Sequence, residues 1–83
     1  MSQGEIVEKV VTYVVGEIVD NQDEIKVEIV PDGSDAVVAE VRTAKSDMGR
    51  VIGKRGRVAR AIRNVGNAAG DEEGLSVEVD FLD

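Results

Sequence analysis

Two glycines that enclose two cations are the residues of this chain whose types and spacing suggest chemistry. The segment Val51 to Arg57 reads VIGKRGR, with Lys54 and Arg55 between Gly53 and Gly56. Glycines let a backbone turn sharply and let a ligand approach without meeting a Cβ. Lysine and arginine supply positive charge for an anionic ligand such as phosphate. The segment therefore predicts a loop that lies against something anionic.

The charges of the chain are segregated along the sequence. The 83 residues carry a formal net charge of −7, yet a single window of +7 leaves −14 for the remainder. The window holds one acid, Asp47, and the bases Arg42, Lys45, Arg50, Lys54, Arg55, Arg57, Arg60 and Arg63. A solvated face with scattered charge is the alternative, but such faces usually mix the two signs. We expect one basic face on an otherwise acidic protein.

The elements that must position the loop begin with an N-terminal helix and a hairpin. Apolar doublets recur every four residues from Ile6 to Val19, which predicts a helix over residues 4–20 despite the strand propensity of valine. A strand would send the two members of each doublet to opposite faces. Apolar and polar residues then alternate, which predicts a β-hairpin over residues 24–42 with its turn at Pro31 to Ser34.

The loop itself falls inside a predicted helix–loop–helix unit over residues 46–69. Ser46 and Asp47 are of the types that cap a helix, here a short one ending at Ile52. A helical wheel of the second helix predicts a core-facing arc made by Val58, Ala61, Ile62, Val65 and Ala69. A last strand is predicted over residues 74–82.

The predicted order α-β-β-α-α-β describes a single α+β domain over residues 1–83, with the helices on one face of a three-stranded sheet. The second helix of the helix–loop–helix unit starts directly after the loop. Its unpaired N–H groups and positive dipole end therefore point toward a bound anion. The repeating anion that suits such an edge is a sugar–phosphate backbone.

At this level of detail the sequence resembles a known family. VIGKRG looks like the I-G-x-x-G signature of KH domains, whose loop clamps about four nucleotides. The element order resembles the type II (prokaryotic) KH arrangement. The chain length and the run SDMGRVIGKRGRVARAIR, Ser46 to Arg63, are similar to the small bacterial single-KH proteins of the KhpA (YlqC) family. The resemblance covers essentially the whole chain.

The resemblance implies that the protein binds single-stranded RNA in a groove. The residues it carries over to the RNA backbone are Gly53, Lys54, Arg55 and Gly56. Further phosphate contacts are implied for Arg50, Arg57, Lys45 and Arg60. Ile52 and Val58 are either an apolar floor for bases or part of the core. The only aromatic residues, Tyr13 and Phe81, lie outside the loop segment, so no aromatic stacking of bases is expected.

The resemblance also implies protein partners. Members of the family form homodimers and pair with a second KH protein, KhpB (Jag/EloR), in post-transcriptional control or as RNA chaperones. We expect a cytoplasmic protein, since the chain has no cysteine, no signal-peptide pattern and no apolar run long enough to span a membrane.

Other classes of function fit the sequence less well. Without histidine or cysteine the chain lacks the usual nucleophile–base pairs and zinc ligands, so we expect no enzyme, metal, cofactor or small-molecule substrate. The adjacent acids Asp71 to Glu73 are interpreted as solvated. A helix-turn-helix DNA-binding domain would carry its polar groups along the second helix, whereas here they concentrate at the turn. A protein-interaction module with a degenerate loop stays open as an alternative.

Overall fold

The computed structural model of the chain describes residues 3–82 and has the predicted element order. Its helices and strands are α1 (Glu5–Ile18), β1 (Lys26–Pro31), β2 (Ala36–Arg42), α2 (Lys45–Ile52), α3 (Arg57–Glu73) and β3 (Ser76–Leu82). Two 3₁₀ turns, η1 (Gln22–Glu24) and η2 (Lys54–Gly56), precede β1 and α3. The order α-β-β-α-α-β and the α+β class are confirmed. Residues 1, 2 and 83 of the predicted domain lie outside the described part.

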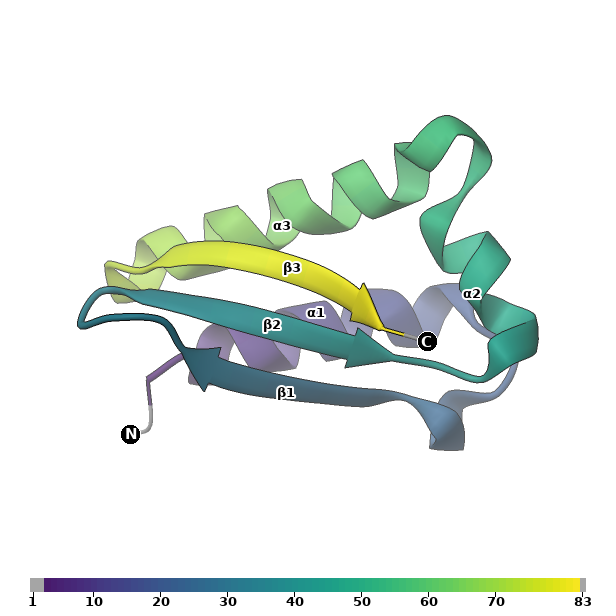
Figure 1. Cartoon of the computed structure of the whole chain (residues 1–83), viewed down its shortest axis with the longest axis horizontal. Coiled ribbons are helices and arrows are strands. Elements are labelled where there is room, and N and C mark those ends of the chain that lie inside the picture. The colour runs from purple at the N-terminus through teal and green to yellow at the C-terminus, as the bar shows by residue number, and fades with distance from the viewer. Residues whose placement is uncertain (1–2, 83) are drawn as a thin grey trace.

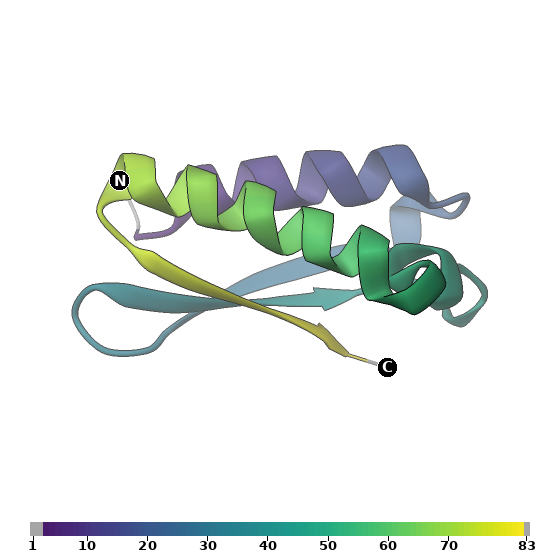
Figure 2. The ribbon, with the colours of Figure 1, turned by 90° about the horizontal axis from the view of Figure 1, so that it is seen from above.

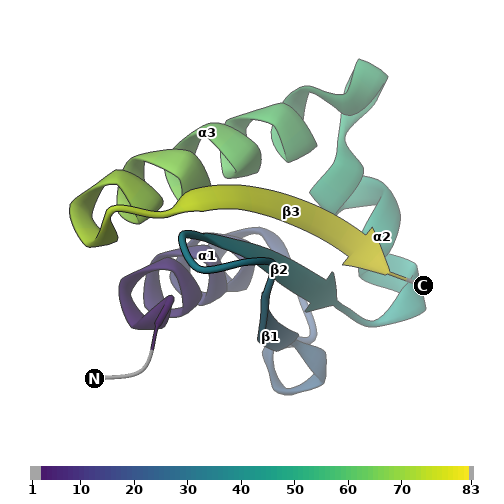
Figure 3. The ribbon, with the colours of Figure 1, turned by 60° about the vertical axis from the view of Figure 1, so that its left-hand side comes forward.

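The sheet has the strand order β1-β2-β3, with β1 antiparallel and β3 parallel to the central β2. The parallel pair is joined by α2, the glycine loop and α3, which together form a crossover of the βαβ kind. Helices α1 and α3 lie side by side on one face of the sheet, and the other face carries no helix (Figures 1, 2 and 3). The glycine loop therefore projects at one end of the molecule, away from the β1–β2 turn (Figure 1).

The core between the helices and the sheet is built almost entirely of valine, isoleucine and alanine. One member of each of the first three α1 doublets is fully buried, at Val7, Val11 and Val15. They pack with Ala39, Val41, Val51, Ile62 and Val79. Burial of this stripe stabilises α1 although valine is a poor helix former, because tertiary packing outweighs intrinsic propensity.

Helix α3 turns a different face to the sheet from the one that the wheel predicts. Ile62 and Ala69 are buried as expected, but Ala61 is exposed and Val65 keeps 37% of its surface in solvent. The inner face is completed instead by very small residues, Ala59, Gly66 and Gly70.

Close approach of backbones explains this rotation. A Cβ on Gly66 would lie 3.2 Å from the Cγ2 atom of Val79, and one on Gly70 would lie 2.7 Å from the carbonyl oxygen of Leu75. The glycines therefore allow α3 to lie nearer to β3 than any larger side chain would permit. The larger Val65 is left at the surface.

The C-terminal end of α3 lies beyond the predicted position. The helix continues past Ala69 to Glu73, and Gly74 ends it with a left-handed φ of 68°. The N–H of Leu75 donates to the carbonyl of Gly70 at 2.9 Å, which closes the turn into β3.

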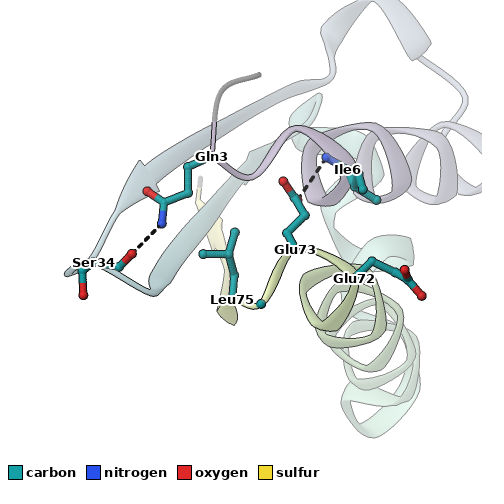
Figure 4. A pocket seen from close by; sticks show the side chains of 7 residues that line it. Gln3, Ile6, Ser34, Glu72, Glu73 and Leu75 are labelled. Carbon is teal, nitrogen blue, oxygen red and sulfur yellow. Dashed lines mark hydrogen bonds between the residues drawn. The ribbon is translucent and has the colours of Figure 1, made fainter.

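The extra turn of α3 brings Glu73 to the start of α1. Its carboxylate accepts hydrogen bonds from the backbone N–H groups of Gly4, Ile6 and Val7 at 3.1 to 3.2 Å. Gly4 has no side chain to cap the helix, so a carboxylate from another helix does so, as the close-up of this region shows for Ile6 (Figure 4). Glu73 was interpreted from the sequence as solvated, and that interpretation is wrong.

The close approach of α3 to β3 predicts opposite effects for two helical Gly→Ala substitutions. Gly70→Ala should lower the free energy of unfolding by about 1–3 kcal/mol, because the added methyl overpacks the α3–β3 turn. Gly49→Ala in α2 meets nothing within 4 Å and should raise that free energy by about 0.5–1 kcal/mol. Urea unfolding of both variants measures the difference, and equal effects would contradict the packing described.

Candidate nucleic-acid interface

The backbone of the loop requires glycine at both of its ends. Gly53 has a φ of 77°, and a Cβ there would lie 2.9 Å from the backbone nitrogen of Val58. Gly56 has a φ of 72° and open space where a side chain would be. The first glycine is needed for the tight junction with α3, and the second leaves the backbone bare toward solvent.

The residue between them is held in an unusual conformation. Arg55 has φ 58° and ψ 25°, and within residues 3–82 it is the only non-glycine residue with a positive φ. Such a conformation costs roughly 1–2 kcal/mol for a residue with a Cβ. A hydrogen bond of 3.1 Å from the N–H of Gly56 to the carbonyl of Gly53 closes the turn. Residues kept in such strain cluster at functional sites, which makes Arg55 a strong candidate.

Five of the predicted cations stand free at the surface around this turn. Exposed side chains without a carboxylate partner belong to Lys45, Lys54, Arg55, Arg57 and Arg60. The ion pairs Glu5–Lys9 and Asp20–Arg50 lie between described residues, and neither involves any of these five cations. The positive charge near the loop is therefore not neutralised within the chain and is available to an anion from outside.

Arg50 differs from the other predicted cations because it already has internal partners. One of its Nη atoms lies 3.0 Å from a carboxylate oxygen of Asp20 and 3.3 Å from the carbonyl oxygen of Ile18. It thereby satisfies a carbonyl at the C-terminal end of α1. The structure shows Arg50 joining α2 to α1 and shows no free guanidinium at this position.

Asp47 makes the second connection between these two helices, and its predicted role as a cap is wrong. Helix α2 begins one residue before Ser46, with Ala44 at the cap position and no side-chain cap. Asp47 is 2% exposed, and its carboxylate accepts hydrogen bonds from the backbone N–H groups of Asp20 and Asn21 at 3.2 and 3.1 Å. The side-chain amide of Asn21 adds a third bond at 3.0 Å.

These bonds change the ionisation of the buried carboxyl. The hydrogen bond from the Asn21 side chain, followed by the two backbone bonds and the charge of Arg50, lowers the pKa of Asp47 below the usual aspartate value, against the opposing effect of burial. The carboxylate therefore stays ionised at neutral pH and holds the turn after α1 against α2.

The two candidate floor residues have different environments. Val58 is half-buried, packs against the main core and fills the space beside Gly53. Ile52 is half-buried too, but it is not among the described residues that pack against that core. Ile52 is thus an apolar side chain at the base of the loop that the core does not use.

The open face of the sheet has the opposite charge from the loop. The strand register places Glu28 beside Glu40 and Glu40 beside Asp80, so three acids form a row across the sheet. Next to this row, the negative charge of Asp80, helped by a hydrogen bond between the two groups, raises the pKa of Glu78. The acids of this row repel a polyanion, whereas the free cations around the loop attract one.

A cavity lies at the other end of the molecule from the loop (Figure 1). It has a volume of about 360 Å³ and is lined by Gln3, Ile6, Ser34, Glu72, Glu73, Gly74 and Leu75 (Figures 1 and 4). Its two carboxylates disfavour an anionic ligand. No cluster of acidic side chains within the described residues is arranged to hold a metal ion.

Sequence reasoning did not include one further pair near the start of α3. The guanidinium carbon of Arg63 lies 5.3 Å from the centre of the Phe81 ring. Arg63 belongs to the basic window, but Phe81 comes from β3, so only the packing of α3 against β3 brings the two together. The sequence did contain a signal that Asp47 is unusual, because it is the one acid in the basic window.

The fold and the glycine loop together define the class of this protein as a KH domain. A family model described as "KhpA/KhpB, KH domain" matches residues 8–81. The chain belongs to this family.

Several named relatives align over most of their length. "RNA-binding protein KhpA" of Borreliella burgdorferi is 35% identical over 75 residues, which cover 90% of each chain. The protein of the same name from Clostridium acetobutylicum is 43% identical over 65 residues, 78% of this chain and 85% of its own. That of Bacillus subtilis is 36% identical over 76 residues, 92% and 93% of the two chains. The comparison with solved structures found no significant match to this chain.

None of the helices in residues 3–82 is both long and apolar enough to cross a membrane.

The buried Asp47 carboxylate predicts a specific dependence of stability on pH. Its folded-state pKa lies below the unfolded value of about 3.9, so its contribution is complete above that value and is lost as the pH falls through the folded pKa. Asp47→Asn should destabilise the protein at neutral pH and lose less stability on acidification than the unsubstituted chain. Urea unfolding between about pH 7 and pH 2.5 measures both curves.

A background substitution removes the main opposing titration. The raised pKa of Glu78 means that protonation relieves its repulsion from Asp80 and adds stability as the pH falls. The Asp47→Asn comparison is therefore repeated in a Glu78→Gln background. Curves that stay parallel down to the lowest pH would contradict an ionised Asp47 clamp.

Proposed function

We propose that this protein binds single-stranded RNA by holding its sugar–phosphate backbone against the loop Gly53–Gly56. The observation that carries the proposal is the loop itself, in which a strained Arg55 and the adjacent Lys54 are exposed and unpaired between two glycines. Membership in a family whose relatives are named RNA-binding proteins supports it.

The other free cations extend this contact beyond the loop. Arg57 and Arg60 follow on the first turn of α3, and Lys45 begins α2. Arg50 contributes less than the sequence suggests, because RNA would have to compete with Asp20 for its guanidinium. Ile52 offers an apolar contact for a base. The acidic open sheet leaves this side of the molecule as the one that RNA can approach.

We also propose protein partners and a cellular location. In this proposal the protein acts in the cytoplasm as a post-transcriptional regulator or RNA chaperone, together with a KhpB-type protein. The description of the matching family names KhpB beside KhpA, which supports the choice of partner. A homodimer is part of the proposal, and the exposed Tyr13 and Val65 on the outer surfaces of α1 and α3 are apolar positions that it could cover. Sedimentation at increasing protein concentration tests this, and a monomer throughout contradicts it.

Reversing the charge of the loop tests the RNA site. The double variant Lys54→Asp/Arg55→Asp should bind a single-stranded oligonucleotide at least about tenfold more weakly, because two phosphate contacts become repulsive. Aspartate tolerates the left-handed conformation at position 55 better than most residues, so the fold should persist. Fluorescence polarisation with a labelled RNA measures the affinity.

A matched variant separates the loop from general electrostatics. Lys9→Asp/Lys26→Asp changes the net charge by the same amount at the two bases outside the basic window. It should leave the affinity within about twofold of the original, because neither lysine belongs to the loop or to the two helices that flank it, and salt screens exposed charges outside the contact. Equal losses in both variants, or a loss in neither, would contradict the site.

A further inference from the structure

The side of α3 that faces the β3 edge carries a cation–π pair of side chains. The guanidinium of Arg63 lies over the ring of Phe81 at 5.3 Å, within the range of a cation–π contact. The ring is half-buried and packs against the core, whereas Arg63 is exposed. The guanidinium therefore covers the ring and, on an exposed side chain, stays accessible to a ligand from solvent.

The pair is placed within reach of an RNA strand on the loop. Arg57, Arg60 and Arg63 follow one another at intervals of three residues along α3, so Arg63 lies about 9 Å along the helix axis from Arg57 and about 120° around it, on the flank next to β3. That distance is shorter than the four-nucleotide stretch that KH loops clamp. Strand β3 is an edge strand, and its C-terminal end lies toward the same end of the molecule as the N-terminal half of α3 (Figures 1 and 2).

We propose that Arg63, supported by Phe81, is a stacking position for one nucleobase of an RNA whose backbone lies on the Gly53–Gly56 loop. This inference rests on the proposed function and adds a base contact to it. Guanidinium planes stack on nucleobases, and here the ring behind the guanidinium holds that plane in place. Nothing in the sequence indicated stacking by an aromatic residue. In the proposed site the guanidinium of Arg63 contacts the base, and the Phe81 ring of another element supports that guanidinium from behind.

A lysine substitution distinguishes stacking from charge. Arg63→Lys keeps the positive charge but replaces a plane by a compact ammonium group. The probes are a short oligoadenylate with 2-aminopurine at successive positions and an abasic ribose-phosphate oligomer of equal length. Arg42→Lys, on the opposite face of the sheet from Phe81, is the matched control.

We expect the original chain to quench 2-aminopurine at one position of the bound strand. Arg63→Lys should lose that quenching and bind the oligoadenylate at least about fivefold more weakly, the lower end of what one stacked base contributes. Its affinity for the abasic oligomer should stay within about twofold. Phe81→Leu, which keeps an apolar side chain in the core, should reduce the quenching in the same way, and Arg42→Lys should change neither reading.

Two results would overturn the inference while leaving the proposed function intact. In the first, Arg63→Lys binds and quenches like the original chain. In the second, it loses affinity equally for the oligoadenylate and the abasic oligomer, which would assign Arg63 to charge alone. If the original chain binds neither oligomer, the proposed function itself fails.

Discussion

The placement of the glycine loop depends on one buried carboxylate. Asp47 lies in α2 and accepts three hydrogen bonds from the turn that follows α1, and Arg50 one turn later binds the end of the same helix. Helix α2 is only eight residues long, which is too short to be stable by itself in water. Its anchorage to α1 therefore fixes the base from which the loop projects. A buried charge without these partners would be strongly unfavourable. The buried position of the carboxylate therefore depends on the donors in the turn, and the conformation of the turn depends on the carboxylate.

Charge segregation then determines which ligand meets the loop. Five cations around α2 and α3 have no carboxylate partner among the described ion pairs. Three acids lie side by side across the open face of the sheet. Adjacent like charges in a sheet are destabilising, so this row is not explained by stability. It is consistent with a protein that a polyanion approaches from one side only. Under the proposed function the loop contacts the RNA backbone whatever the base sequence, and Arg63 over Phe81 is the position proposed to contact a base.

The parts of the fold that carry a periodic hydropathy signal were predictable from the sequence. The doublets of α1, the alternation in all three strands and the glycine pair of the loop each appear where the pattern indicates. The inner face of α3 was not predictable in this way. Gly66 and Gly70 face the sheet because they have no side chain, and a residue without a side chain gives no apolar signal in a hydropathy pattern. Asp47 was assigned to its own helix because capping rules are local, whereas its donors lie 26 and 27 residues earlier. The cations at the loop were named correctly as exposed groups, but the pairing of Arg50 depends on how α1 meets α2.

The central claim is that unpaired loop cations bind an RNA backbone, and the salt dependence of binding tests it most directly. If about four phosphates are neutralised, the logarithm of the affinity for single-stranded RNA should fall against the logarithm of salt concentration with a slope near −3. The Lys54→Asp/Arg55→Asp variant should give a distinctly shallower slope wherever its binding is measurable. A slope near zero for the unsubstituted chain would contradict the account.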